Sequence, residues 1–222
     1  MATIKKESLC GVVLAGGKGR RMHSQDKGLL ELDGQTLLDR VVARAQPQVA
    51  ELVISCNAPS PAYWNSQLLL LPDNLAKDGD TDKNDYRGPL AGILAAMEWC
   101  QQYRPQYLWL ASFAVDTPFF PNDLCERLGD AIDGDTDIIC PVSGGRRHPV
   151  FCLWRIDQAS DLRQTLLSGN SRLHDWLDLR RTRDLQFTHD NKSSGDPFFN
   201  INTPAQLTEA AALLHDGDHN LA

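Results

Sequence analysis

Three glycines and three cations follow the first apolar run of the chain, in the stretch LAGGKGRRM, residues 14–22. Glycines let the main chain approach a ligand closely and turn its N–H groups toward it. Lysine and arginine add cationic donors, and arginine can hold a phosphate through two hydrogen bonds. This composition suits the binding of a nucleotide polyphosphate.

Two well-known phosphate-binding motifs do not fit this loop. A P-loop requires GxxxxGK[ST], and no Gly-Lys pair of the chain is followed by Ser or Thr. A dinucleotide fingerprint requires GxGxxG, and the stretch that begins at Gly17 reaches Met22 instead of a third glycine. The alternative is a glycine-rich turn with a solvated basic face, which the preceding apolar run and the clustered cations disfavour.

The charge of the whole chain differs from the charge of this loop. Lysine and arginine number 22 against 29 acidic residues, so the net charge is −7, which disfavours general binding to nucleic acids or membranes. Four cations, Lys18, Arg20, Arg21 and Lys27, nevertheless lie within ten residues that contain one acid, Asp26. The cluster fits a small anionic ligand better than a polyanion.

The six cysteines show no metal or redox spacing. No two of them form a CxxC pair, and each stands beside apolar residues, so we expect small buried hydrophobic side chains in a reducing compartment. They are Cys10, Cys56, Cys100, Cys125, Cys140 and Cys152.

Apolar runs such as Leu68–Leu71 are of strand length, and none approaches the ~18 residues that span a bilayer. The first seven residues contain no apolar stretch of signal-peptide length. We therefore expect a cytoplasmic protein that binds no membrane.

Strand-like runs alternate with helical periods along the chain. We expect strands over residues 9–14, 52–56, 67–71, 107–111, 137–142 and 148–153. We expect helices over 37–45, from 88–89, from 121, and over 157–167, 171–177 and 203–214. This alternation predicts a three-layer α/β fold with a mostly parallel, doubly wound, Rossmann-like sheet. Such sheets bind ligands at the carboxyl ends of their strands, so chemistry should be sought in the loops that follow strands.

The length fits a single domain over residues 1–222. Residues 76–87 are rich in charges and poor in apolar side chains, which predicts a flexible loop. We expect flexible tails over about 1–8 and 215–222.

Six stretches carry a resemblance to a known family: GVVLAGGKGRRM, DKGLLELDG, GPLAGI, VDTPFFP, RHPVF and NINTPAQL, in this order from Gly11 to about Leu207. Together they resemble the molybdenum cofactor guanylyltransferases, within the larger group of pyrophosphorylase-like nucleotidyltransferases. The resemblance implies that the sheet is of the nucleotidyltransferase type.

The same resemblance implies a reaction. GMP passes from GTP to molybdenum-molybdopterin, which gives the molybdopterin guanine dinucleotide cofactor and pyrophosphate. The step needs in-line positioning, Mg²⁺, and cationic donors on the leaving pyrophosphate. GTP and the molybdopterin cofactor are then the ligands, and a molybdenum-insertion protein and molybdoenzyme chaperones are the expected partners.

Matching to the family motifs implies a set of site residues. Lys27 and Arg21 would act on the phosphates and, with Asp116, form the catalytic group, and Asp116 would also bind the metal. Contacts to nucleotide or cofactor are implied for Leu14, Ala15, Gly16, Gly17, Lys27, Asn57, Asp73, Gly88, Gly92, Asp116, Asn200 and Asn202. Gly16 would leave room for a purine, since relatives that transfer CMP typically read LAAG where this chain reads LAGG.

Several of these residues have a structural alternative. Asp116 could cap the helix near Pro121 or form a turn with Thr117, Asp73 could belong to a turn, and Asn202 could cap the final helix with Thr203. The family usually shows two asparagines around one residue where this chain has Ser55-Cys56-Asn57, so either Ser55 replaces the lost contact or the contact is absent.

Two other functions compete with the guanylyltransferase. One is a related nucleotidyltransferase that uses CTP or a sugar-phosphate-like acceptor. The other is a nucleotide-binding regulatory protein without turnover, which would need no metal carboxylate. The default oligomeric state is a monomer.

Overall fold

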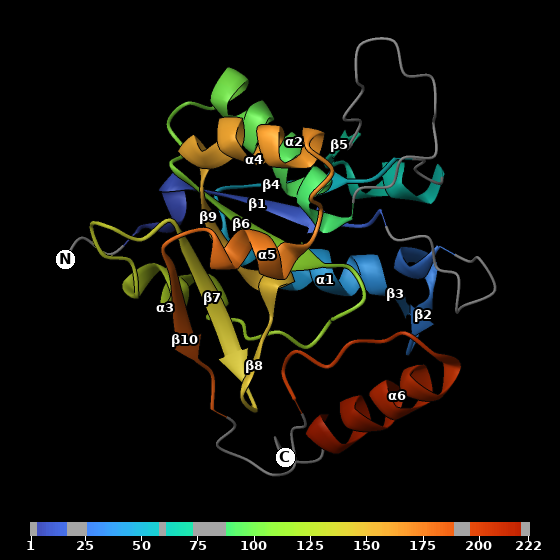
Figure 1. Ribbon diagram of the computed structural model, residues 1–222. Coiled ribbons are helices and arrows are strands. Elements are labelled where there is room, and N and C mark those ends of the chain that lie inside the picture. Colours follow the sequence, from blue (N-terminus) through green and yellow to red (C-terminus); the bar gives the residue numbers. More distant parts are fainter. Residues whose placement is uncertain (1–3, 17–25, 58–60, 73–87, 189–195, 219–222) are drawn as a thin grey trace.

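The computed structural model describes residues 4–16, 26–57, 61–72, 88–188 and 196–218 of the 222-residue chain. Its strands are β1 (Leu9–Leu14), β2 (Glu31–Leu32), β3 (Gln35–Thr36), β4 (Glu51–Ser55), β5 (Leu69–Leu71), β6 (Trp109–Ala114), β7 (Ile138–Ser143), β8 (Arg146–Arg147), β9 (Leu153–Arg155) and β10 (Thr182–Gln186). Its α-helices are α1 (Leu37–Ala45), α2 (Pro89–Tyr103), α3 (Leu124–Asp130), α4 (Ala159–Leu167), α5 (Leu173–Asp178) and α6 (Pro204–Asp218). Figure 1 shows their arrangement.

The main sheet has the strand order β10-β7-β9-β6-β1-β4-β5, with β8 paired to β7. The neighbours of β1 on both sides, β4 and β6, run parallel to it, as β5 does to β4 and β10 to β7. The antiparallel members are β9, between β6 and β7, and the short β8. The predicted mostly parallel α/β sheet is confirmed.

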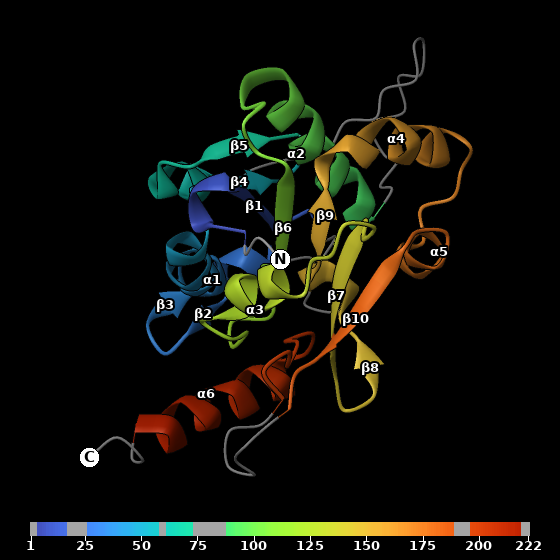
Figure 2. The same ribbon diagram turned by 90° about the vertical axis from the view of Figure 1, so that its left-hand side faces the viewer.

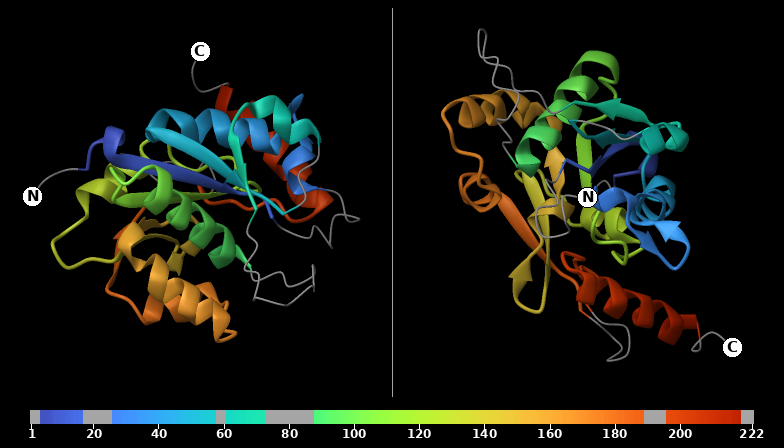
Figure 3. Two further views of the ribbon diagram at one scale, coloured as in Figure 1. Left: turned by 90° about the horizontal axis from the view of Figure 1, so that it is seen from above. Right: turned by 90° about the vertical axis from the view of Figure 1, so that its right-hand side faces the viewer.

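Helices cover both faces of this sheet, as Figures 2 and 3 show. The side chains of β1 alternate between two cores: Leu9 and Val13 pack with residues of α1 and α3, whereas Cys10 and Val12 pack with residues of α2, α4 and α5. A strand that is buried on both faces must be apolar throughout, which is why the run that precedes the glycine-rich loop contains no charged residue.

A small third core lies away from the main sheet. Leu32 of the β2–β3 hairpin, Leu37, Ile201 and Ala210 of α6 are buried together, and Figure 1 shows α6 beside this hairpin. The hairpin turn is Asp33-Gly34, with φ of 51° and 73°, the left-handed pair that a two-residue turn demands. This core fixes the segment that precedes α6, and that segment contains Asn200 and Asn202.

The strand predicted over 148–153 is wrong. Pro149–Phe151 forms a 3₁₀ helix and β9 begins only at Leu153, because proline lacks the N–H that a strand would donate and is suited to the first position of a helix. The strand expected over 107–111 lies later, at Trp109–Ala114, and the helix expected from Pro121 begins at Leu124.

The ends of the chain also differ from expectation. The tail predicted over 215–222 starts as helix, since α6 extends to Asp218. At the other end Lys6–Ser8 forms a 3₁₀ helix, and Ile4 packs on the first core. The loop predicted over 76–87 lies outside the described residues.

All six cysteines are free and buried, as the sequence predicts. Among the described residues, no helix combines the length and the apolar composition that crossing a membrane requires.

Candidate active site

A cavity of about 230 Å³ opens at the carboxyl ends of β1, β4 and β6, beside the N-terminus of α2. The chain passes from β1 through α1 to β4 on one side and returns from β5 through α2 to β6 on the other side of β1. Open α/β sheets bind ligands at such a reversal of strand order. The residues that line the cavity are Leu14, Ala15, Gly16, Lys27, Ser55, Gly88, Pro89, Gly92, Ala114, Val115, Asp116, Val150 and Asn200. Most of the predicted site residues therefore meet in one place.

Among the described residues that line this cavity, Lys27 is the cation. Its Nζ donates to Asp116 Oδ2 at 2.7 Å and also to Asn202 Oδ1. Both side chains of the ion pair are 16% exposed, so water screens the pair only in part. The chain positions joined here are 27, 116 and 202, which lie far apart in sequence.

Asp116 follows β6 within a tight turn. Its main-chain oxygen accepts from Ile201 N at 2.8 Å, and its Oδ1 lies 3.4 Å from the Thr117 hydroxyl, which can donate only weakly at that distance. The residue that precedes α3 is Asp123, and it makes no side-chain cap. The capping alternative for Asp116 is therefore excluded, and the stronger of its side-chain contacts points to Lys27.

Asn200 and Asn202 flank the fully buried Ile201 in a segment that forms no strand. Asn200 lines the cavity, whereas Asn202 does not line it and contacts its Lys27. Thr203 Oγ1 caps α6 by accepting from Gln206 N at 3.2 Å, and Gln206 Oε1 accepts from the main-chain N of Asn202. Because Thr203 supplies the cap, the amide side chain of Asn202 is available to Lys27.

The side chain of Asn200 differs from that of Asn202 in its hydrogen bonding within the described structure. Its Oδ1 is buried and has no hydrogen-bond partner among the described residues. An unpaired buried acceptor costs about 1–3 kcal/mol, and such groups are typical of positions that await a ligand.

Gly88 and Gly92, at the start of α2, are required for different reasons, one for backbone conformation and one for close packing. Gly88 adopts φ 70° and ψ −169°, a region open almost only to glycine. A Cβ on Gly92 would lie 2.6 Å from Ser55 Oγ and 2.9 Å from Leu14 Cδ2, so Gly92 allows α2 to approach β1 and β4. Gly92 also lines the cavity, so the contact with nucleotide or cofactor that the resemblance implies stays a prediction.

The loop that follows β1 lines the cavity through Leu14, Ala15 and Gly16. The N–H of Ala15, however, donates to Ser55 O at 2.9 Å and continues the sheet. The prediction that the amides of this stretch hold the nucleotide therefore does not extend to Ala15, which contributes the wall of the cavity.

Ser55 lines the cavity and is 2% exposed, whereas the exposed Asn57 is not among the lining residues. Of the two residues left open by the sequence, the structure brings Ser55 to the site. Gly17, Arg21, Asp73 and the neighbouring Arg20 lie outside the described residues.

Sequence reasoning missed two residues behind the site, Asp26 and Tyr63. Asp26 caps the 3₁₀ helix η2 (Lys27–Leu29), and the hydroxyl of the buried Tyr63 donates to its Oδ1 at 2.7 Å. An aspartate two residues before a glycine is a turn signal that could have identified Asp26. No local signal identifies Tyr63, because its partner is distant in sequence.

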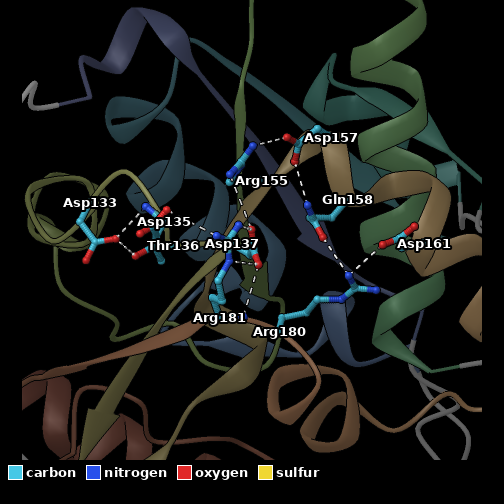
Figure 4. A network of polar contacts seen from close by, with 10 residues as sticks. All are labelled: Asp133, Asp135, Thr136, Asp137, Arg155, Asp157, Gln158, Asp161, Arg180 and Arg181. Atoms are coloured by element: carbon cyan, nitrogen blue, oxygen red, sulfur yellow. Dashed lines mark hydrogen bonds and ion pairs between the residues drawn. The ribbon is translucent and has the colours of Figure 1, made fainter.

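A second cavity, of about 500 Å³, lies at the opposite edge of the sheet beside Leu108 and Ile156. Figure 4 shows the polar network next to it, in which Asp137 accepts from Arg181 Nε at 3.0 Å and Nη2 at 2.8 Å. These hydrogen bonds hold the pKa of Asp137 below its usual value. Every carboxylate drawn there has a cationic or hydroxyl partner within the protein, so the network fits a structural role.

The fold and the ligand cavity with its lysine–carboxylate pair define an α/β protein of the nucleotidyltransferase class. The family model described as "MobA-like NTP transferase domain" matches residues 11–185. The chain belongs to this family.

Named relatives agree with that assignment. Two proteins called molybdenum cofactor guanylyltransferase, from Rhodopseudomonas palustris and Mesorhizobium japonicum, are 38% and 36% identical to the chain. The alignments cover 91% of this chain and 90% of the first relative, and 94% and 97% for the second. The crystal structure of molybdopterin-guanine dinucleotide biosynthesis protein A from Archaeoglobus fulgidus shares the fold, with TM-score 0.68 at 23% identity, over 93% of this chain and 98% of that one.

Proposed function

We propose that the protein transfers GMP from GTP to molybdenum-molybdopterin, with release of pyrophosphate. The observation that carries the proposal is the pair of Lys27 and Asp116 in a cavity at the carboxyl edge of the sheet, with Asn202 hydrogen-bonded to Lys27. The relatives named above supply the identity of the two substrates, since they carry that activity in their names.

Lys27 would serve the phosphates of GTP. Its ammonium now neutralises Asp116 at 2.7 Å, and a triphosphate offers a stronger anion for the same donor. A phosphate oxygen of the acceptor attacks the α-phosphorus, the bond from that phosphorus to the β-phosphate oxygen breaks, and pyrophosphate leaves. The protein holds the reactants in line and compensates the charge of the leaving group.

The site also fits a magnesium ion, because it offers oxygen ligands. Mg²⁺ favours one or two carboxylates together with phosphate oxygens and water, and Asp116 lines the cavity as does Asn200, whose Oδ1 has no described partner. We propose that Asp116 holds the ion. When bound, Mg²⁺ would neutralise charge on the phosphates.

The activity is tested by incubating the protein with molybdenum-molybdopterin, MgCl₂ and either GTP or CTP, and by measuring pyrophosphate. We expect release with GTP, loss of release in Asp116→Ala, and unchanged circular dichroism of that variant. Release with CTP alone would identify the cytidylyl-transferring alternative. Nucleotide binding without any release would identify a regulatory protein.

Gly16 supplies a test of base preference. It lines the cavity, and we propose that its missing side chain leaves room for guanine. The variant Gly16→Ala should lower kcat/KM for GTP more than for CTP. Full retention of the preference for GTP would contradict the steric explanation.

We further propose that the enzyme acts as a monomer in the cytoplasm, where a reducing environment keeps its six buried cysteines as thiols. It would receive its acceptor from a molybdenum-insertion protein and pass its product to molybdoenzyme chaperones. Sedimentation at micromolar concentration tests the oligomeric state.

A further inference from the structure

Tyr63 is a fully buried tyrosine whose hydroxyl makes a hydrogen bond to a carboxylate. It lies in the 3₁₀ helix η4 (Pro61–Ser66), between β4 and β5, with 0% of its surface exposed. Its Oη donates to Asp26 Oδ1 at 2.7 Å. Burial, and next the hydrogen bond to Asp26, raise the pKa of Tyr63 far above its usual value, so the hydroxyl stays a donor throughout the physiological range.

The acceptor of this bond shapes the turn that presents Lys27. Asp26 is the N-cap of η2, and its Oδ1 accepts from the main-chain N of Gly28 at 3.0 Å as well as from Tyr63. One carboxylate oxygen therefore joins the turn to the buried phenol, and the residue between the two anchored positions is Lys27.

Packing joins the same parts. Gly28 is buried against Tyr63, and a Cβ added to Gly28 would collide with Tyr63 Oη and lie 3.3 Å from Val115 Cγ2. Val115 directly precedes Asp116. The phenol of Tyr63 thus packs against the turn from which Lys27 Nζ reaches Asp116 and Asn202.

We propose that Tyr63 is a positioning residue of the nucleotidyl transfer, which acts through Asp26 to hold the Lys27 ammonium in place for the triphosphate. Tyr63 is not among the residues that line the cavity, so it acts without touching substrate. The inference rests on the proposed function, in which Lys27 binds phosphate.

The test compares two tyrosines that each donate to a carboxylate. Tyr63→Phe removes the bond to Asp26, and the control Tyr107→Phe removes a bond to Glu51 at the opposite edge of the sheet. Dissociation constants of GTP and of guanosine, which has no phosphate, are measured for both. We expect Tyr63→Phe to weaken GTP binding roughly ten-fold, the effect of one hydrogen bond to a charged group, and to leave guanosine binding and the control unchanged.

A double variant shows whether the effect passes through Lys27. In the Lys27→Ala background, Tyr63→Phe should have no further effect on GTP binding, because the group that it positions is gone. If Tyr63→Phe does not fold, Asp26→Ala undergoes the same comparison, with thermal unfolding as the check of folding.

Three results would overturn the inference: unchanged GTP binding in Tyr63→Phe, equal weakening of GTP and guanosine, or a full effect that persists without Lys27. A different result separates the proposed function from this inference. If Lys27→Ala itself leaves GTP binding unchanged, the phosphate-binding role of Lys27 and this inference are both wrong, while pyrophosphate release still tests GMP transfer. A strong effect of Lys27→Ala with none of Tyr63→Phe refutes the role of Tyr63 alone.

Discussion

The two ends of the parallel strands use charged and polar residues in opposite ways. We call them the carboxyl edge, where β1, β4 and β6 end, and the amino edge, where the same strands begin. At the carboxyl edge, Lys27 bridges Asp116 and Asn202, and Asn200 Oδ1 is buried without a described partner. At the amino edge, Asp137 is 5% exposed and receives two hydrogen bonds from the Arg181 side chain and one from its main-chain N.

In the part of the amino edge that the structure describes, one buried side-chain donor has no hydrogen bond, Arg180 Nε. Its guanidinium nevertheless lies 4.0 Å from the centre of the Trp176 ring and bonds Asp161 through Nη1. Compensation of this kind stabilises the fold, because buried polar groups cost free energy when unpaired. Incomplete pairing at the carboxyl edge leaves groups for a ligand, so the comparison assigns stability to one edge and binding to the other.

The largest expected effect separates the two edges with one cation from each. Lys27→Ala should lower kcat/KM for GTP by roughly 100-fold or more, the scale of lost charge compensation in a transition state, and it should also cost some stability, because Asp116 and Asn202 lose their shared donor. Arg181→Ala should lower the melting temperature, because Asp137 loses both hydrogen bonds from the guanidinium and keeps the weaker contacts to the main-chain N of residue 181 at 3.3 Å and to Arg155 at 3.6 Å. It should leave kcat/KM unchanged. Pyrophosphate release and calorimetry give the two readings.

The opposite pattern of activity and stability in the two variants would contradict the assignment of binding to the carboxyl edge and stability to the amino edge. If Arg181→Ala reduced activity as much as Lys27→Ala at a temperature where both are folded, the amino edge would belong to the catalytic machinery.

The next effect concerns acid stability. Folding lowers the pKa of Asp137, through its hydrogen bonds to Arg181 first, below the usual value of about 3.9. The stabilisation is therefore complete above about pH 5 and is lost as the pH falls through the folded-state pKa. At pH 7, Asp137→Asn should destabilise the protein by about 1–3 kcal/mol, and the difference from wild type should shrink below pH 4.

A matched carboxylate serves as the control for this prediction. Asp161 is paired with Arg180, yet its side chain is 56% exposed, so Asp161→Asn should cost at most about 1 kcal/mol. Urea unfolding at several pH values measures both variants. A deficit of Asp137→Asn that stays constant down to pH 2.5 would exclude the charge of Asp137 as its cause.

Backbone strain gives a smaller effect at the carboxyl edge. Gly88 has φ 70° and ψ −169°, so Gly88→Ala should destabilise the protein by about 1–2 kcal/mol. Gly134 at the amino edge has open space around it, so Gly134→Ala should be neutral or stabilise by less than about 1 kcal/mol. Equal melting temperatures of the two variants would show that the conformation of Gly88 carries no cost.

The sequence allowed the layers and most of the site to be predicted, because both depend on local pattern. The apolar run at 9–14 and the helical period at 37–45 have the boundaries of β1 and α1, and the strand-end position of Asp116 follows from the run before it. Strand β10 was missed since Thr182–Gln186 lies at the sheet edge, where a half-exposed strand carries polar residues.

Other parts could not be predicted because they depend on distant pairs. Asn202 bonds Lys27 with its side chain, and Thr203 caps α6. This division of roles could not be predicted, because it depends on Lys27, which is distant in sequence. The choice of Ser55 over Asn57 depends on where β4 ends against β1 and α2. The Asp33-Gly34 turn, by contrast, is a short-range hairpin signal that the sequence contained and that was overlooked.

The smallest expected effect tests the carboxyl edge at its unpaired acceptor. Asn200→Leu removes a buried oxygen that has no described hydrogen bond, so we expect the free energy of unfolding to rise by about 1 kcal/mol. The same variant should weaken binding of the Mg²⁺–GTP complex, or raise KM for the acceptor, because the oxygen is then absent when ligand arrives. Asn202→Leu is the matched variant, and it should lose stability, since its Oδ1 accepts from Lys27. If Asn200→Leu were less stable than wild type, its oxygen would already have a partner in the free protein, and the difference between the two edges would not extend to Asn200.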